Sequence, residues 1–486
     1  MAVRFDPRGT FAPTPGSYRL LPLRFERIDE SRVVATNLVG EFVVLPRAML
    51  SDLVEGRLHP DAPEYRELKT RHFLTDDRSS VALDLLALKA RTKAEPIAEF
   101  TGLHMFVVTL RCDHSCAYCQ VSRQTADKSR YDMTFEHAAK AVDLVFNSPS
   151  STIKIEFQGG EPLLNFDVIR HVVELAEERN RTEQRKLQFV IATNLSQLND
   201  EILAFAAAHN LVFSTSLDGP EDLHNGNRPR PGRNSHELAL AGIERIRSTL
   251  GIDKVSALMT TTPRALGRVR EIVDEYLRLG FRSVFLRPIS PYGFAVRSKI
   301  ADGYSIDDWL SFYIEGLDYI LSLNEQGIAI REEYTSIVLE KIVTQRGTRY
   351  VDLQSPSGLG ISAIVYNYDG KVYASDEARM LAEMKDESFL LGHVDTHTWA
   401  DIFTSDKLLS VLASTVAESV PMCTDCAFLP YCGSDPAYHQ AMQRDPVGHK
   451  AKSSFCKRNM GVFKHILRIL NDRPERADIL KGWVAA

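Results

Sequence analysis

Seven cysteines stand in two groups along the 486-residue chain. Three fall within eight residues and four within 34 residues nearer the C-terminal end: Cys112, Cys116 and Cys119, then Cys423, Cys426, Cys432 and Cys456. An odd number of cysteines, grouped in this way in a chain without an apolar secretion signal, argues against a disulfide framework. Two separate thiolate groups predict two metal sites.

The first group has the spacing C-x3-C-x2-C, directly after a predicted strand. Three thiolates on one tight loop can each bind one iron of a four-iron cluster, whereas most such clusters take four cysteines. The fourth iron would then be free to bind a substrate or cofactor. A structural zinc site with His114 as the fourth ligand is the alternative, although structural zinc prefers C-x2-C pairs and closed tetrahedra.

The second group has the spacing C-x2-C-x5-C, and Cys456 follows after 23 intervening residues. Four thiolates close a cluster completely, which suits electron transfer or structural anchoring better than substrate ligation. Zinc is a competing interpretation, because C-x2-C is its usual half-site.

Short β-branched runs alternate with amphipathic helical stretches between residues 105 and 288. The predicted strands are 104–110, 152–157, 187–193, 211–216, 255–261 and 283–288, and the predicted helices are 135–146, 166–178, 200–209, 235–250 and 264–279, with Thr134 and Asn234 as N-caps. This alternation predicts a parallel sheet with right-handed crossovers. Six strands suit a partial (β/α)6 barrel of the TIM type, in which chemistry lies on loops after the strands' C-terminal ends. We therefore expect an α/β fold.

The flanking segments differ from this core. Residues 17–75 predict antiparallel strands followed by a short helix, and 306–346 predict two helices, the first capped near Ser305. Residues 363–375 predict a hairpin, in which Asp369 and Gly370 suit a tight primed turn. We expect four units: an N-terminal module with a connector (1–95), the barrel (96–305), linking helices (306–355) and a C-terminal domain with the second cysteine group (356–486).

Charge and hydropathy exclude several classes of protein. The chain has 58 Lys and Arg against 64 Asp and Glu, a net charge of −6, so nothing predicts a nucleic-acid partner. Its apolar runs are shorter than the ~20 residues that cross a bilayer, so we expect no membrane partner and a cytoplasmic location. His104 and the other histidines on predicted strands and helices are interpreted as structural.

The C-x3-C-x2-C loop resembles the signature of the radical S-adenosylmethionine (SAM) superfamily, with Tyr118 as the aromatic residue before the third cysteine. In that family the open iron chelates the amino and carboxylate groups of SAM. Reduction of the cluster then cleaves SAM to a 5′-deoxyadenosyl radical that abstracts hydrogen from the substrate. The resemblance implies that Cys112, Cys116 and Cys119 hold the catalytic 4Fe–4S cluster.

Further positions match the family's SAM-binding motifs. The loop 158–163 is similar to the one that receives the SAM amine, with glycines for close backbone approach and a carboxylate beside the cation. The resemblance assigns SAM binding to Tyr118, Gly159, Gly160, Glu161, Pro162, Asn194, Ser216 and Arg228. Leu195 stands where the family usually has glycine, which leaves the role of Asn194 open. Asp218 belongs either to a similar S-x-DGP run or to an ordinary turn.

The second cysteine group resembles the SPASM and twitch domains of peptide-modifying radical SAM enzymes. The pattern is complete for one auxiliary 4Fe–4S cluster, formed by Cys423, Cys426, Cys432 and Cys456. Pro436 and Ser375 stand where fuller patterns have cysteines for another cluster. The resemblance therefore implies two 4Fe–4S clusters, one of them SAM-binding. We expect the hairpin end, Asp376, Glu377 and Arg379, to line the substrate cavity.

The N-terminal segment resembles PqqD-like winged-helix modules, which bind a leader peptide as an added strand. A packing role alone is the alternative. The whole arrangement is similar to the His-Xaa-Ser system (HxsB-like) maturases. It implies a ribosomally made precursor peptide as substrate, a flavodoxin or ferredoxin as electron donor and a second radical SAM maturase as partner. The competing hypotheses are a sulfatase-maturase-like Cys or Ser oxidase, and a non-catalytic iron–sulfur redox or peptide-binding protein.

Overall fold

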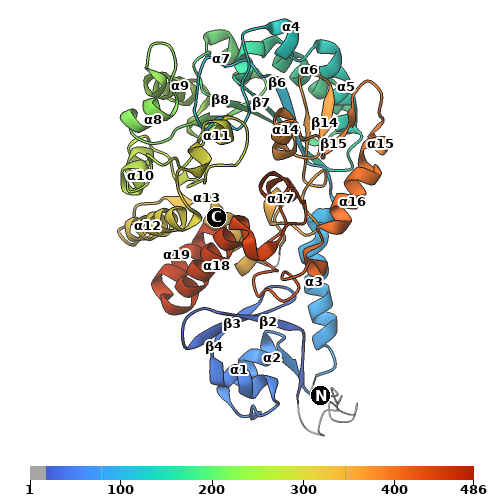
Figure 1. Cartoon of the computed structure of the whole chain (residues 1–486), viewed down its shortest axis with the longest axis vertical. Helices are drawn as coiled ribbons and strands as arrows, with labels where there is room; N and C mark the ends of the chain where they lie inside the picture. Colours follow the sequence, from blue (N-terminus) through green and yellow to red (C-terminus); the bar gives the residue numbers. More distant parts are fainter. Residues whose placement is uncertain (1–17, 78, 345, 486) are drawn as a thin grey trace.

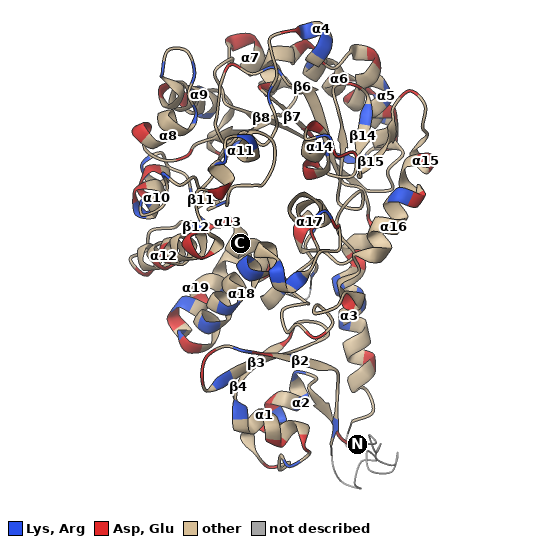
Figure 2. Cartoon of the chain, in the orientation of Figure 1, with Lys and Arg blue, Asp and Glu red and all other residues tan. Residues whose placement is uncertain are grey.

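The computed structural model describes residues 18–77, 79–344 and 346–485. The expected absence of a secretion signal concerns the first 20 residues, most of which lie outside these ranges. Among the helices described, none is long and apolar enough to cross a membrane. Acidic and basic residues are mixed across the chain (Figure 2), in agreement with the near-balanced composition.

The N-terminal module is a three-stranded antiparallel sheet followed by three helices (Figure 1). Its elements are β1 (Arg19–Leu20), β2 (Leu23–Arg27), β3 (Arg32–Asn37), β4 (Phe42–Pro46), α1 (Arg47–Val54), α2 (Pro63–Thr70), β5 (Leu74–Thr75) and α3 (Ala82–Ala98). Val33 and Leu45 on the sheet pack with Leu53 and Leu68 from the first two helices into a small separate core. The expected strands and first helix are confirmed, while the connector contains one 17-residue helix.

Five strands of the predicted core form one side of a mixed eight-stranded sheet with the order β10-β9-β8-β7-β6-β13-β14-β15, in which the first six strands are parallel. The elements of this core are β6 (Leu103–Thr109), α4 (Lys128–Tyr131), α5 (Phe135–Phe146), β7 (Thr152–Gly159), α6 (Phe166–Glu183), β8 (Lys186–Thr193), α7 (Asp200–Ala208), β9 (Val212–Ser216), α8 (Glu221–Asn227), α9 (Ser235–Leu250), β10 (Val255–Leu258), α10 (Val269–Arg278), β11 (Ser283–Val284) and α11 (Phe294–Arg297). The parallel sheet predicted from the alternation is thus confirmed.

The expected sixth strand is much shorter than predicted. β11 has two residues and pairs with β12 (Arg331–Glu332) instead of β10. Beyond β11, a bridge joins Thr261 to Pro288, and the Thr261 amide donates to Arg287 O at 2.8 Å. Pro288, at the end of the predicted strand, has no N–H with which to extend this bridge into a ladder.

The C-terminal part returns to the same sheet. It comprises α12 (Ile306–Glu325), α13 (Glu333–Val343), β13 (Ala363–Tyr366), β14 (Lys371–Tyr373), α14 (Asp376–Glu383), β15 (Leu390–His393), α15 (Trp399–Phe403), α16 (Asp406–Ser414), α17 (Pro436–Gln443), α18 (Ser454–Asp472) and α19 (Pro474–Ala485). β13 pairs in parallel with β6, so the predicted hairpin extends the barrel sheet and forms no separate sheet.

Two local predictions are wrong. The hairpin turn is not primed, because only Gly370 has a positive φ (+81°) while Asp369 does not. A turn closed by Gly370 N donating to Asn367 O precedes this glycine. Asn234 precedes α9 without capping it, since its side chain accepts from Arg230.

The other predicted caps are confirmed by side-chain hydrogen bonds. Thr134 accepts from His137 N at the start of α5. Ser305 and Asp308 form a reciprocal capping box at the start of α12, as in other S/T-x-x-D/E starts.

Candidate active site and the two cysteine groups

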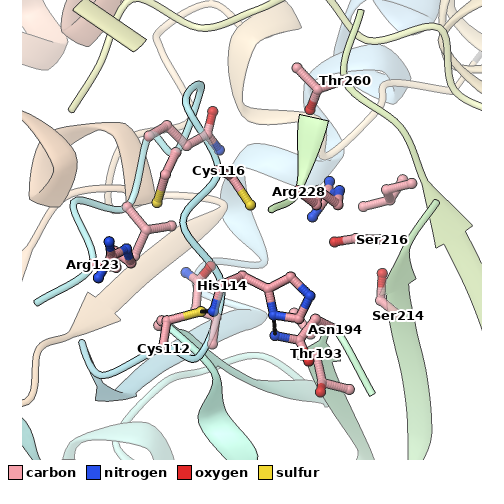
Figure 3. A pocket seen from close by; sticks show the side chains of 18 of the residues that line it. Cys112, His114, Cys116, Arg123, Thr193, Asn194, Ser214, Ser216, Arg228 and Thr260 are labelled. Carbon is pink, nitrogen blue, oxygen red and sulfur yellow. Dashed lines mark hydrogen bonds between the residues drawn. The ribbon is translucent and has the colours of Figure 1, made fainter. Parts of the chain in front are cut away.

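A cavity of about 270 Å³ lies at the C-terminal ends of the parallel strands, beneath the first cysteine loop (Figure 3). Polar side chains reach it from β7, β8 and β9 and from the segment after β10. The cavity collects most of the predicted site residues: Cys112, Cys116, Tyr118, Cys119, Gly159, Gly160, Asn194, Ser216 and Arg228. Parallel strands place their ends at one edge of a sheet, so motifs far apart in sequence meet here.

The cysteine loop is fixed at its base by a buried arginine. The Arg111 guanidinium forms two hydrogen bonds of 2.7 Å with the Asp132 carboxylate and donates to Leu164 O. Ser115 N donates to Pro229 O at 2.8 Å, and Phe294 N donates to Cys119 O at 2.8 Å. These contacts tie the loop to four separate segments of the core.

Two glycines after β7 allow the loop to pack closely. Gly159 has φ +144°, and a Cβ built there would lie 2.0 Å from Thr109 O. At Gly160 a Cβ would lie 2.1 Å from Arg111 O. Any side chain at either position would therefore push away the backbone that carries the first cysteine.

Glu161 and Pro162 are not among the residues that line the cavity, and their assignment to SAM binding stays a prediction. The buried Glu161 carboxylate accepts from the Thr193 hydroxyl at 2.5 Å and from Asn194 N at 2.8 Å. Burial raises the pKa of Glu161 to about 7. Pro162 is buried in the short helical turn that follows. Glu161 thus fixes the end of β8.

Arg228 is held in the cavity wall by Asp218. The sequence alone leaves open whether Asp218 belongs to an ordinary turn or to the functional site. The Arg228 and Asp218 side chains form a bidentate pair at 3.0 and 3.2 Å, and Asp218 is fully buried. The Tyr118 hydroxyl donates to the same carboxylate at 2.7 Å, and Arg228 lies 5.3 Å from the centre of that ring. Asp218 therefore positions both the arginine and the tyrosine.

His114 is occupied by hydrogen bonds on both ring nitrogens. Its Nδ1 lies 2.8 Å from an Asp113 oxygen, and its Nε2 lies 2.8 Å from Ser235 Oγ. The same hydroxyl lies 3.0 Å from His224 Nε2. This arrangement leaves His114 no free lone pair for zinc, although its ring, Asp113 and Cys112 offer ligand atoms within 4.8 Å of one another. No sequence signal identified Ser235 as the shared partner.

Asn194 contacts the cysteine loop. Its side-chain amide donates to Asp113 at 3.0 Å and lies 2.9 Å from His114 Nδ1. Leu195 has φ +65°, which explains why glycine suits this position in the family. Its side chain packs on Gly242 of α9, where a Cβ would lie 2.7 Å from Leu195 Cβ.

The second cysteine group lies on a turn-rich loop between α16 and α17 and at the start of α18. Ser453 caps α18 by accepting from Cys456 N. The Cys432 carbonyl accepts from Lys341 Nζ at 3.0 Å. The four thiols lie near enough to perturb one another electrostatically: Cys423, Cys426, Cys432 and Cys456. The structure thus gathers the four predicted ligands.

The two positions that lack cysteines of the fuller pattern begin helices instead. Ser375 caps α14 by accepting from Ala378 N, and Pro436 is the first residue of α17. Of the expected cavity residues, Asp376 lines the first cavity and Glu377 lines a second one beside it. The prediction for Arg379 is wrong, since it is buried, donates to Val121 O at 3.2 Å and lines neither cavity.

The N-terminal module holds the second cysteine loop directly. Thr36 of β3 donates to Ala427 O at 2.6 Å, and the buried Tyr431 hydroxyl donates to Gly40 O at 2.6 Å. Arg24 of β2 donates to Thr424 O. Figure 1 shows this sheet directly below the C-terminal helices. The module therefore supports the loop between Cys423 and Cys432.

The cysteine sets fit iron–sulfur clusters better than single zinc ions. A tetrahedral zinc with 2.3 Å bonds needs sulfurs about 3.8 Å apart. Among the residues described, no three sulfurs of either group lie within 4.8 Å of one another. Burial raises the pKa of the Cys116 and Cys426 thiols to about 12, so bound metal is needed to keep them as thiolates.

Comparisons with known proteins agree with this geometry. A family model described as "Radical SAM superfamily" matches residues 106–274. An uncharacterized protein of Methanocaldococcus jannaschii is 30% identical over 188 residues, which are 38% of this chain and 61% of the relative. A cysteine-type anaerobic sulfatase-maturating enzyme of Clostridium novyi is 21% identical over 373 residues, covering 74% of this chain and 94% of the enzyme.

Solved structures share the fold over most of the chain. Native anSMEcpe with bound AdoMet superposes with a TM-score of 0.63 at 17% identity and covers 79% of this chain and 99% of its own. Streptococcus suis SuiB bound to its precursor peptide SuiA has a TM-score of 0.54 at 13% identity and covers 90% of this chain and 100% of its own. The part of the chain that matches the radical SAM model is thus the core with three thiols over the strand ends, and the chain spans 61% of the length of its Methanocaldococcus jannaschii relative.

Proposed function

We propose that this protein is a radical SAM enzyme that modifies side chains of a ribosomally synthesised precursor peptide. The observation that carries the proposal is the three-thiol loop over a polar cavity, beside a second cavity that shares Arg287 with the first. When bound, a 4Fe–4S cluster with SAM supplies one-electron cleavage and hydrogen abstraction. The names of the relatives, sulfatase-maturating enzymes and a peptide-bound SuiB, support a peptide as substrate.

The protein's own residues bind and orient. Cys112, Cys116 and Cys119 would hold the SAM-binding cluster. Arg228, fixed by Asp218, presents a guanidinium to an anionic ligand group, and bidentate geometry suits a carboxylate. Ser214 and Ser216 present side chains from β9 to the same cavity (Figure 3), and hydroxyls of this kind can hydrogen-bond ribose.

Cys423, Cys426, Cys432 and Cys456 would hold an auxiliary cluster that accepts an electron or anchors the domain. Replacing Cys423 by Ala should leave SAM cleavage intact and impair conversion of the peptide if the cluster passes electrons. Full product yield from a folded variant would show that the auxiliary cluster is dispensable for conversion of the peptide.

The N-terminal sheet would bind the leader of the precursor, as a peptide strand added to its edge. Phe25 on the edge strand β2 is 52% exposed and offers an apolar contact. This architecture supports a His-Xaa-Ser-type maturase. Calorimetry of the full chain with the precursor peptide encoded beside it, followed by mass spectrometry after SAM and dithionite are added, tests the proposal. We expect binding and a mass change, and a peptide that binds but keeps its mass would contradict the assigned reaction.

A further inference from the structure

A second cavity, of about 50 Å³, lies against the first. Arg287 lines both, and the neighbouring residues Asp376 and Glu377 line the first and the second. The two cavities therefore meet at the start of α14. Asp435, one residue before α17, closes another side of the second cavity. It thus lies beside the helix starts that replace the cysteines of the fuller pattern.

Aromatic rings form much of the wall of the second cavity. They are Phe285, Tyr292, Trp309, Tyr334, Tyr350 and Tyr438. Tyr292 and Trp309 are each 1% exposed, and in the described part of the chain the Tyr292 hydroxyl and Trp309 Nε1 have no hydrogen-bond partner. Buried polar atoms of this kind are normally satisfied, so their placement in a cavity wall points to a ligand.

Five charged side chains also line the cavity: Asp352, Glu377, Asp435, Arg287 and Arg458. Among the described residues, none of the five forms an ion pair within 4.0 Å with another of them. Asp435 accepts a hydrogen bond from Tyr438 N, and Arg458 lies 5.0 Å from the Phe455 ring. With every group ionised, three carboxylates face two guanidiniums in this cavity.

Unpaired buried charges are costly, and a bound ion of opposite sign relieves that cost. Burial and the neighbouring carboxylates raise the pKa of Asp352 to about 7 and that of Asp435 well above its usual range, so these groups favour their protonated forms unless a cation is bound beside them, and a bound cation favours their carboxylates. The rings around them add to the attraction for a cation, because aromatic faces carry negative potential.

We propose that the second cavity binds a cationic side chain of the peptide substrate, on a residue near the one that is modified. This inference rests on the proposed function and adds the chemical class of the neighbouring residue. The Asp352, Glu377 and Asp435 carboxylates receive the cation, and the orphaned Trp309 N–H is available to a peptide carbonyl. The shared wall with the first cavity places this residue beside the reacting one.

Two amino-acid probes with capped, uncharged termini test the proposal on the anaerobically reconstituted, SAM-bound full chain. N-acetyl-arginine amide and N-acetyl-citrulline amide have nearly the same shape, and only the first is charged. We expect calorimetry to show about tenfold or greater preference for the arginine probe, the range of a charged hydrogen bond. Glu377→Gln and Asp352→Asn should each reduce that preference, whereas Glu383→Gln, on the same helix but outside both cavities, should retain it.

Equal binding of the two probes, or no binding of the arginine probe, would overturn the inference. Tighter binding of N-acetyl-glutamate amide would also overturn it and would assign recognition to the two arginines. SAM cleavage by the same wild-type preparation separates this result from the proposed function. Cleavage without probe preference contradicts only the cation site, while absence of cleavage contradicts the enzyme assignment.

Discussion

Replacing Asp218 by Asn tests how the SAM cavity is positioned. The substitution keeps the shape of the side chain and an acceptor for the Tyr118 hydroxyl, but it removes the charge that faces Arg228 at 3.0 Å. Both groups are largely shielded from water, since their side chains are 0% and 12% exposed. Breaking a buried pair costs about 3 kcal/mol or more, because the remaining charge stays desolvated. We expect that loss in the free energy of unfolding.

The same variant should bind SAM more weakly, because the guanidinium loses its fixed orientation. A double-mutant cycle with Arg228→Met, read by urea unfolding and by equilibrium binding of SAM to the reconstituted protein, isolates the pair. Once Arg228 is gone, Asp218→Asn should cost much less, giving a coupling of about 2 kcal/mol. Additive single effects, with SAM affinity unchanged in Asp218→Asn, would refute the assigned positioning role.

Three further predictions concern other parts of the chain. Gly159→Ala should reduce bound iron by about half, because its Cβ would displace the backbone before the first cysteine, whereas Gly482→Ala, with open space around it, should keep full iron content. Burial lowers the pKa of His104 from 6.5 to about 4, so the unfolded chain binds more protons between these values and stability falls as pH falls. The wild type should lose about 2 kcal/mol of unfolding free energy between pH 7.5 and 5 through this group, and His104→Gln should lose correspondingly less. Tyr431→Phe should lower the urea midpoint by removing about 1 kcal/mol of a buried hydrogen bond to Gly40 O, and an unchanged midpoint would argue against docking of the module on this loop.

The sequence predicts the parallel core well because hydrophobic periodicity and strand-end motifs are local signals. Thr134 and Ser305 could be assigned as caps for the same reason, since each bonds within three residues. Glu161 shows the limit of a motif: its residue types predict the loop, but the direction of its side chain depends on Thr193, at the end of the next strand, and on Asn194 just after it.

Tertiary partners account for the other differences. The position of β13 beside β6 is set by pairing across more than 250 residues of sequence, which no local pattern encodes. Ser235, shared between His114 and His224, and the second cavity are likewise formed by segments distant in sequence.

Formation of 5′-deoxyadenosine tests the central claim most directly. The reconstituted wild type, incubated anaerobically with SAM and dithionite, should form this product, and Cys112→Ala should form none while retaining the iron of the second cysteine group. Product from the wild type at the level of the Cys112→Ala control would contradict the assignment of the three-thiol loop as the site of SAM cleavage.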